Sequence, residues 1–226
     1  MQRLVTPELL DTDSGTPEEI AASVSDLRRI NRWFGGIATS QSMVQSVSRR
    51  SGLRSLSLLE VAAGAGDLPL TLRERLRVRG IHLEVTLLDR LHSHLHLRTN
   101  AAQAVAGDAL ALPFADASFD LVSCCLFAHH LGHEELVRFV SEALRVCRIA
   151  VLINDLVRHP LHLVLVYAGF PLYRGRLTRH DAPASVHAAY TPREMLEILR
   201  RTNAAEVDLT RHYLFRMALV ISKSKP

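Results

Sequence analysis

The sequence predicts an α/β fold: a doubly wound, mostly parallel sheet with an antiparallel last strand, preceded by a helical cap. Two observations lead to this prediction. From about residue 55, short apolar runs alternate with segments of helical periodicity, as expected of buried parallel strands joined by helices. Two further apolar runs, about 205–213 and 215–223, are close enough to pair as a hairpin. The 226 residues suit one domain, or one domain with a small appendage.

Two helices are expected ahead of the sheet. The stretch Thr-Pro-Glu-Glu at 16–19 supplies an N-cap, a proline at the first helical position and a capping-box glutamate, and a Gly-Gly pair at 35–36 ends this helix. The second helix covers about 38–50 and stops before a glycine. Residues 1–15 read as a loose leading segment, and we expect 1–52 as a whole to form a cap over the ligand-binding edge of the sheet.

The main domain is expected over residues 53–226. Its strands are predicted at 55–62, 82–89, 103–108, 119–130 (ending in a histidine-rich turn) and 148–155, and its helices at 67–78, 91–102, 133–146 and 191–203. An irregular apolar stretch at 160–173 and a loop at 174–190 lie between the fifth strand and the last helix. We expect 156–190 to serve as a lid or substrate segment.

Acidic residues end the first three strands: Glu60, Asp89 and Asp108. Ligands of open α/β sheets lie beyond the carboxyl ends of the strands, so these carboxylates would repel one another unless a cationic or polyhydroxylated ligand lay between them. A dinucleotide fits poorly, because Pro69 stands where its fingerprint needs a third glycine, and no Walker lysine follows the loop. S-adenosylmethionine, with its sulfonium, ammonium, ribose diol and adenine amino group, suits three acceptors.

Four motifs resemble those of class I S-adenosylmethionine-dependent methyltransferases of the quinone-biosynthesis-like type. They are LEVAAGAGD, LLDR, GDALALPF and FDLVSCCLFAHHL, in that order over about residues 55–155. The resemblance implies a Rossmann-like seven-stranded sheet, S-adenosyl-L-methionine as cofactor and methyl transfer as the reaction. The stretches DLRRINRWFGG, INDLVRHPLH and RHDAPASVHAAYTPREM are similar to a narrower set, bacterial methyltransferases associated with type III polyketide synthases.

The resemblance also implies the cofactor-binding residues. Glu60 would receive the methionine ammonium, and Gly64 and Gly66 would let the backbone approach the methionyl and ribose parts. Asp89 would accept both ribose hydroxyls, and Asp108 the adenine amino group. The other implied cofactor-binding residues are Ala62, Arg90, Ala109, Leu110, Cys124 and Leu126.

One part of the loop departs from the family pattern. Ala62 and Ala63 replace its first glycine and the usual neighbour, and the Ala62 methyl group reduces the clearance for a cofactor. This departure supports an alternative in which the chain is a catalytically inactive cofactor-binding module.

Three histidines are candidates for the catalytic base. Methyl transfer needs an acceptor that is aligned with the methyl group and relieved of its proton. A phenol, with a pKa near ~10 like tyrosine, can lose its proton to a neutral histidine. His129 and His130 follow the fourth strand, and His180 adjoins Asp181. A purely structural role is the competing interpretation for each, and Asp155 is expected to be a supporting or loop residue.

Two aromatic residues and one apolar stretch each allow two roles, and a group of histidines raises the question of a metal site. Trp33 and Phe34 either stack on an aromatic acceptor or pin the first helix to the sheet. The apolar stretch 161–173 is either a substrate wall or a lid packed on the core. His92 and His96 could grip zinc from one helix face, with His94 nearby. No cysteine or carboxylate completes that set, so we predict a solvated face and no metal.

Composition argues against several other classes. The net charge is +4, but no basic stripe with interleaved aromatics occurs, so we expect no nucleic-acid partner. Three cysteines, an odd number, favour a reducing compartment over a disulfide framework; the adjacent Cys124 and Cys125 are expected to fill the core. No signal-peptide pattern occurs and the longest apolar stretch is too short to span a bilayer, so we expect a cytoplasmic protein without membrane association.

The sequence therefore predicts a methyltransferase of secondary metabolism. Its acceptor is expected to be a small phenolic or polyketide-like natural product, methylated on a hydroxyl. An RNA methyltransferase remains the alternative enzyme, although no Asn/Asp-Pro-Pro-aromatic motif follows the fourth strand. The oligomeric state stays open between a monomer and a homodimer.

Overall fold

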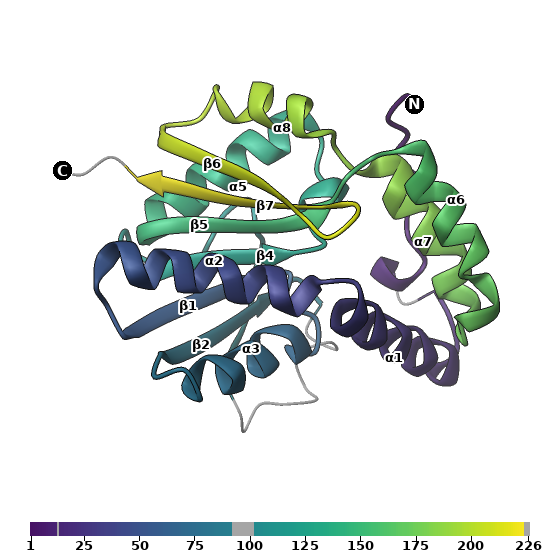
Figure 1. Ribbon diagram of the computed structural model, residues 1–226, viewed down its shortest axis with the longest axis horizontal. Helices are drawn as coiled ribbons and strands as arrows, with labels where there is room; N and C mark the ends of the chain where they lie inside the picture. Colours follow the sequence, from purple (N-terminus) through teal and green to yellow (C-terminus); the bar gives the residue numbers. More distant parts are fainter. Residues whose placement is uncertain (13, 92–101, 224–226) are drawn as a thin grey trace.

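A seven-stranded sheet forms the centre of the computed structural model, which describes residues 1–12, 14–91 and 102–223 (Figure 1). Its order is β3-β2-β1-β4-β5-β7-β6, and β7 runs antiparallel to both of its neighbours. The strands are β1 (Ser55–Val61), β2 (His82–Asp89), β3 (Gln103–Ala106), β4 (Phe119–Cys125), β5 (Cys147–Leu156), β6 (Ala204–His212) and β7 (Arg216–Lys223). The predicted fold class, with its antiparallel last strand, is confirmed.

The strand order reverses between β1 and β4, which pair in parallel from Leu58–Leu121 to Val61–Cys124. At such a switch point the connections leave toward opposite faces, so a crevice opens beyond the carboxyl ends of these two strands. The predicted cofactor loop follows β1 directly and the histidine-rich turn follows β4, so both lie at this crevice.

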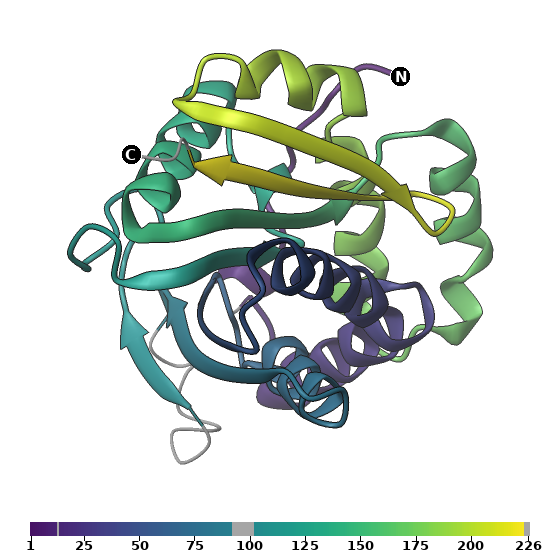
Figure 2. The ribbon, with the colours of Figure 1, turned by 60° about the vertical axis from the view of Figure 1, so that its left-hand side comes forward.

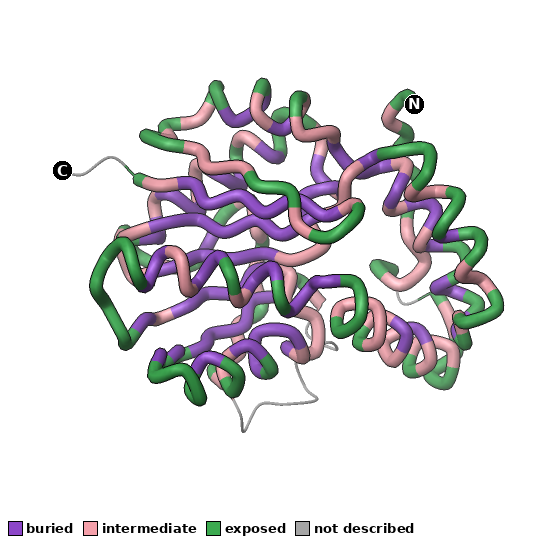
Figure 3. The backbone as a smooth tube through the Cα atoms, in the orientation of Figure 1, coloured by how far each residue is buried: buried purple, intermediate pink, exposed green. Residues whose placement is uncertain are grey.

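Both faces of the central strands are buried, which explains their continuous apolar runs. Leu58 and Leu59, neighbours in β1, belong to different core clusters because successive side chains of a strand point to opposite faces. One face is covered by α2 (Gly36–Ser51) and α3 (Asp67–Arg77), and the other by α5 (His133–Val146) and α8 (Pro192–Leu199) (Figure 3).

A second group of helices lies beyond the carboxyl ends of the strands. It consists of α1 (Pro17–Trp33), α6 (Pro160–Ala168) and α7 (Arg176–Ala188), at the right of Figure 1, and Figure 2 shows the same grouping from another side. Of the two helices predicted as a cap, only α1 takes this position. Met43, Val44 and Val47 of α2 are buried against the sheet, so α2 is part of the layer that covers it. The division at residue 52 stays a prediction.

The loop predicted at 174–190 is wrong, since this stretch contains α7. Pro183 lies inside the helix, where proline costs about 3 kcal/mol of stability. The polar composition of this stretch also resembles that of a loop. Tertiary packing overrides this local preference: Leu177, Ala184 and Val186 are buried, and the Thr178 hydroxyl lies 2.7 Å from that of Ser23 in α1.

The remaining elements are short or agree with expectation. The capping box predicted at Thr16 forms, and a second capping box forms at Thr191. Three short 3₁₀ helices, η1 (Leu10–Thr12), η3 (Ala128–His130) and η4 (Phe170–Leu172), complete the described elements. The helix predicted at 91–102 and the histidines 92, 94 and 96 lie outside the described residues, apart from the flanking positions 91 and 102. No helix within the described ranges is long and apolar enough to cross a membrane.

Candidate active site

A cavity of about 1610 Å³ opens at the carboxyl ends of the central strands. The loops after β1, β2, β3 and β4 line one side of it. Helices α1, α6 and α7, together with residues 5–11 of the N-terminal segment, line the other. The volume exceeds the roughly 300–1,000 Å³ of an ordinary small-molecule site, so the cavity has room for two ligands side by side.

Glu60, next to last in β1, lines the cavity with 2% of its surface exposed. Its Oε2 atom has no hydrogen-bond partner among the described residues, a costly state for a buried polar atom. Burial raises the pKa of this carboxyl to about 7, although a hydrogen bond with the Ser123 side chain partly offsets the effect. A buried carboxyl group with one unpartnered oxygen at a cavity wall is suited to receive a cationic ligand group.

Asp89 shapes the loop after β1. One carboxylate oxygen accepts the backbone N–H of Gly64 at 2.8 Å, and the other accepts that of Leu91 at 2.9 Å. Gly64 has φ +51° and open space where a Cβ atom would project. The loop backbone therefore presents a bare surface to the cavity beside a carboxylate.

Gly66 has a different role from the one predicted. It does not line the cavity; a Cβ atom there would lie 2.6 Å from Cδ1 of Leu87, at φ +72°. The position needs glycine because the Leu87 side chain fills the space behind the loop.

Most of the other predicted cofactor-binding residues do line the cavity. Asp108 is exposed at its rim, and its Oδ1 accepts the N–H of Leu110 at 2.9 Å. The lining also includes Ala62, Arg90, Ala109, Leu110 and Leu126. The structure thus brings the three predicted carboxylates, Glu60, Asp89 and Asp108, to one cavity, while their contacts with a cofactor stay a prediction.

Cys124 is an exception: its side chain is buried in the core, and the cavity is lined by the next residue, Cys125. The alternation of side chains along β4 explains the difference. Burial raises the pKa of Cys124 well above its usual value and that of Cys125 to about 12. Both thiols stay protonated at neutral pH, as expected of residues that are not nucleophiles.

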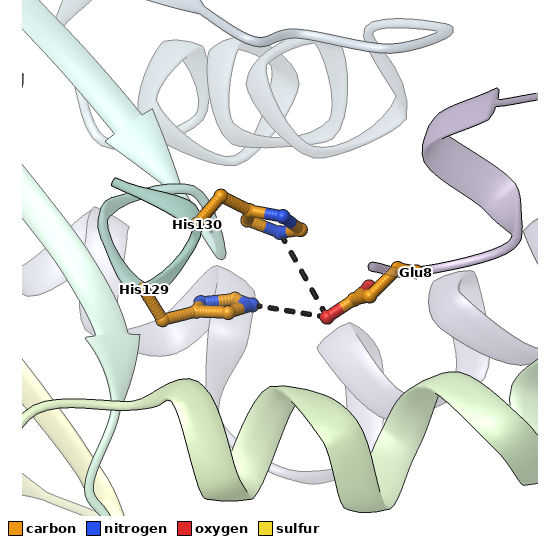
Figure 4. Close-up of side chains that lie close together, drawn as sticks. All are labelled: Glu8, His129 and His130. Carbon is orange, nitrogen blue, oxygen red and sulfur yellow. Dashed lines mark ion pairs between the residues drawn. The ribbon is translucent and has the colours of Figure 1, made fainter. Parts of the chain in front are cut away.

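His129 and His130 lie in η3, and Glu8 of the N-terminal segment faces both of their rings (Figure 4). Nε2 of His129 is 3.4 Å from Oε1 of Glu8, and Nε2 of His130 is 3.9 Å from the same oxygen. On the opposite ring edges, Nδ1 of His129 lies 2.7 Å from Asp155 and Nδ1 of His130 lies 2.8 Å from Asp11. Asp155 therefore supports His129 from behind, as predicted.

The environment of His129 does not suit a neutral base. Burial alone would lower its pKa, but the Asp155 carboxylate, with Glu8, raises the pKa to about 10. These two carboxylates therefore favour the protonated ring, which donates hydrogen bonds and does not accept a proton. The prediction of His129 as a neutral base is therefore corrected.

His180 does not reach the cavity. Its side chain is 43% exposed on α7, where Nδ1 lies 2.8 Å from Asp181. Asp181 instead accepts the backbone N–H groups of Leu9 and Leu10, and so fixes the N-terminal segment. The prediction of His180 as a base is wrong because α7 turns it toward solvent.

The N-terminal segment is well anchored, contrary to the loose segment expected there. The Arg3 guanidinium donates to the carbonyls of Ala188, His129 and Leu131, and it lies 4.1 Å above the Tyr190 ring. The sequence analysis did not single out Glu8, because no local pattern marks a carboxylate whose partners are more than a hundred residues away.

Arg216 was also missed. It is buried at the start of β7, lines the cavity, and donates to Asn154 and to the carbonyl of Phe34. Among the residues that the structure describes, no carboxylate forms an ion pair with Arg216. A buried cation with only neutral partners is suited to an anionic ligand group.

The mouth of the cavity is apolar. Trp33 is 58% exposed and Phe34 is likewise exposed, and both line the cavity, so neither pins α1 to the sheet. Leu165, Val166 and Tyr173 of the 160–173 stretch line the wall beside them.

Comparison with known proteins identifies the domain. Residues 59–151 match a family described as "Methyltransferase domain". This central part of the chain is thus similar to a methyltransferase domain. This match supports the predicted enzyme class, a methyltransferase, and solved methyltransferases of the same fold contain SAH, which is consistent with the predicted cofactor. A search of curated proteins finds no match to this chain.

Solved structures of methyltransferases share the fold of this chain at low sequence identity. The plantazolicin methyltransferase BamL, solved with a triazolic desmethylPZN analog and SAH, is 14% identical with a TM-score of 0.71, covering 96% of this chain and 94% of that one. The magnesium protoporphyrin IX methyltransferase ChlM from Synechocystis PCC 6803, with bound SAH, is 16% identical with a TM-score of 0.57 and 84% coverage of both chains. The CMeT domain of the citrinin polyketide synthase is 15% identical with a TM-score of 0.58, covering 76% of this chain and 47% of that one.

Proposed function

We propose that the protein transfers the methyl group of S-adenosylmethionine to a hydroxyl of a small, mostly apolar acceptor, such as a phenolic or polyketide-like natural product. One observation carries the proposal. A single cavity joins the carboxylate rim of Glu60, Asp89 and Asp108 to an apolar wall and to the cluster of Glu8, His129 and His130.

The rim residues fit the cofactor group by group. Glu60, whose Oε2 is buried without a partner, would receive the ammonium. Arg216, which lines the same cavity and contacts Cys125, would receive the carboxylate of the same methionine moiety. Asp89 would accept the ribose hydroxyls beside the bare backbone of Gly64. When bound, S-adenosylmethionine supplies a methyl group already activated by its sulfonium.

The protein's own work is then alignment and removal of a proton from the acceptor. The apolar mouth at Trp33, Phe34 and Tyr173 would hold an aromatic or aliphatic body by burial of its surface. Glu8 and His130 lie where the acceptor hydroxyl would meet polar groups.

The structural neighbours support a small-molecule acceptor. BamL was solved with a triazolic desmethylPZN analog, and its similarity covers 96% of this chain. The narrower association with type III polyketide synthases and with secondary metabolism stays a prediction from the sequence.

Calorimetry and product analysis together test the proposal. The protein should bind one S-adenosylhomocysteine per chain. Asp89→Ala should weaken binding about 10–100-fold, because a hydrogen bond to a charged group contributes about 1.5–3 kcal/mol. The control Asp116→Asn changes an exposed acid outside the cavity and should bind like wild type. Methyl transfer from S-adenosylmethionine to a member of a phenol panel would support the acceptor class; transfer to RNA alone would overturn it.

A further inference from the structure

We propose that Glu8, His129 and His130 form a binding site for a divalent transition-metal ion, with Zn²⁺ the best match, on the acceptor side of the cavity. This departs from the sequence prediction of a protein without metal. The three ligands come from the N-terminal segment and from η3, more than a hundred residues apart, and their approach is visible in Figure 4.

The distances suit three ligands around one ion. The three ligand atoms all lie within 4.8 Å of one another, with Oε1 of Glu8 at 3.4 Å from Nε2 of His129 and 3.9 Å from Nε2 of His130. Zinc bonds of about 2.0–2.1 Å separate tetrahedral ligands by roughly 3.3–3.4 Å. One pair already has this spacing, and a small side-chain rotation of the partly exposed His130 would bring the other to it.

The outer ring edges are held as metal-binding histidines usually are. Such histidines commonly place their second nitrogen on a carboxylate, which fixes the ring orientation and strengthens the ligand. Here both do: His129 contacts Asp155 at 2.7 Å and His130 contacts Asp11 at 2.8 Å, each through Nδ1. The Ser185 hydroxyl donates to Oε1 of Glu8 at 2.5 Å and so fixes the oxygen that faces the two rings.

An unpartnered buried atom marks the centre of the site. His129 is 2% exposed, and its Nε2 has no hydrogen bond among the described residues, although Glu8 lies 3.4 Å away. This spacing is that of two ligands bound to one tetrahedral ion. A metal ion bonded to Nε2 in place of a proton would satisfy both that nitrogen and the facing carboxylate.

The ligand types select the metal. Two imidazoles and one carboxylate form the set found at zinc sites that keep a coordination position open, whereas Mg²⁺ and Ca²⁺ prefer oxygen ligands alone. All three residues line the cavity, so the open position faces the space left for an acceptor.

A role for the metal rests on the proposed function. The ion would hold the acceptor hydroxyl and ease loss of its proton to water. The oxygen would then form a bond to the methyl carbon as the carbon–sulfur bond breaks and its electron pair passes to sulfur, giving a methyl ether and S-adenosylhomocysteine.

Metal titration of tag-free protein stripped with a chelator tests the site without using activity. Wild type should take up one Zn²⁺ per chain, and one Co²⁺ should give visible absorption bands of a low-coordinate site. Glu8→Gln and His130→Ala should each weaken Zn²⁺ binding at least about tenfold; both residues are partly exposed, so the variants should fold. Asp11→Asn should weaken it less than either ligand variant.

The control is His82→Ala, which removes an exposed histidine at the opposite end of β2 and should bind Zn²⁺ like wild type. Equal Zn²⁺ affinity in wild type, Glu8→Gln and His130→Ala, or no uptake by wild type, would overturn the metal site. Binding of S-adenosylhomocysteine in the presence of chelator reports on the cofactor site separately. Its loss would count against the proposed function, and its retention without metal uptake would count against the metal site alone.

Discussion

The Asp155 carboxylate holds His129 at two points: Oδ1 lies 2.7 Å from Nδ1 of the ring, and Oδ2 accepts the backbone N–H at 3.0 Å. Both residues are fully buried where β5 ends beside η3. The side chain and the backbone of the histidine turn are thereby fixed to the central sheet by one carboxylate.

Asp155→Asn should accordingly destabilise the protein strongly. Breaking a buried pair by removing one charge costs about 3–5 kcal/mol, because the other charge is left uncompensated. Urea unfolding at pH 7 in the presence of chelator measures the change. The exposed pair of Arg193 and Glu197 provides the control, since Glu197→Gln should change stability by less than about 1 kcal/mol. Similar losses in both variants would contradict a special role for Asp155.

Glu60 should make cofactor binding depend on pH. Burial raises its pKa to about 7, and an ammonium group favours the ionised form, so affinity for S-adenosylmethionine should rise by about tenfold between pH 6 and pH 8. Binding near pH 7 should release protons, which calorimetry in buffers of different ionisation enthalpy detects. Glu60→Gln should abolish both effects. An unchanged pH dependence in this variant would rule out Glu60 as the group responsible.

Glu60 should also make the unfolding free energy depend on pH, but here the contribution falls as pH rises. A carboxyl whose pKa is raised on folding binds its proton more tightly in the native state, so its contribution is complete below about pH 4.5 and is lost as pH rises toward 7. Glu60→Gln should therefore remove part of any decrease in unfolding free energy between pH 5 and pH 7. Denaturant titrations of both proteins at these pH values measure the difference.

Gly64→Ala and Gly66→Ala should have distinct effects. Each costs roughly 1–2 kcal/mol for a side chain in the left-handed region. At Gly64 the new methyl group enters open cavity space, so cofactor binding should be lost while the fold persists. At Gly66 it meets Leu87 at 2.6 Å, which adds about 1–3 kcal/mol of overpacking. If Gly64→Ala bound S-adenosylhomocysteine normally, the cofactor would not lie against this backbone.

Ala62→Gly, at the position that departs from the family pattern, should increase the stability of the protein. Ala62 has φ +53°, where glycine has no Cβ penalty, so the exchange should raise the unfolding free energy by about 0.5–1 kcal/mol after glycine's entropy cost. It should also maintain or tighten cofactor binding. A loss of stability in thermal or urea unfolding would contradict the strain assigned to Ala62.

Local patterns predicted much of the fold and the rim of the site. Helix α5 follows its predicted bounds, and Glu60, Asp89 and Asp108 reach one cavity because strand ends in a parallel sheet share an edge. The acceptor side depends on contacts that sequence spacing does not reveal. His180 has its carboxylate next to it in sequence and faces solvent, whereas His129 has its carboxylates from Asp155 and Glu8, which folding alone brings near.

The central claim is that one cavity holds S-adenosylmethionine at the carboxylate rim and an acceptor at the Glu8, His129 and His130 cluster. A crystal structure with S-adenosylhomocysteine tests it most directly. We expect the ribose on Asp89, the ammonium at Glu60, and the sulfur facing the side of the cavity lined by the cluster. Cofactor density elsewhere, or a ribose that avoids Asp89, would contradict the account.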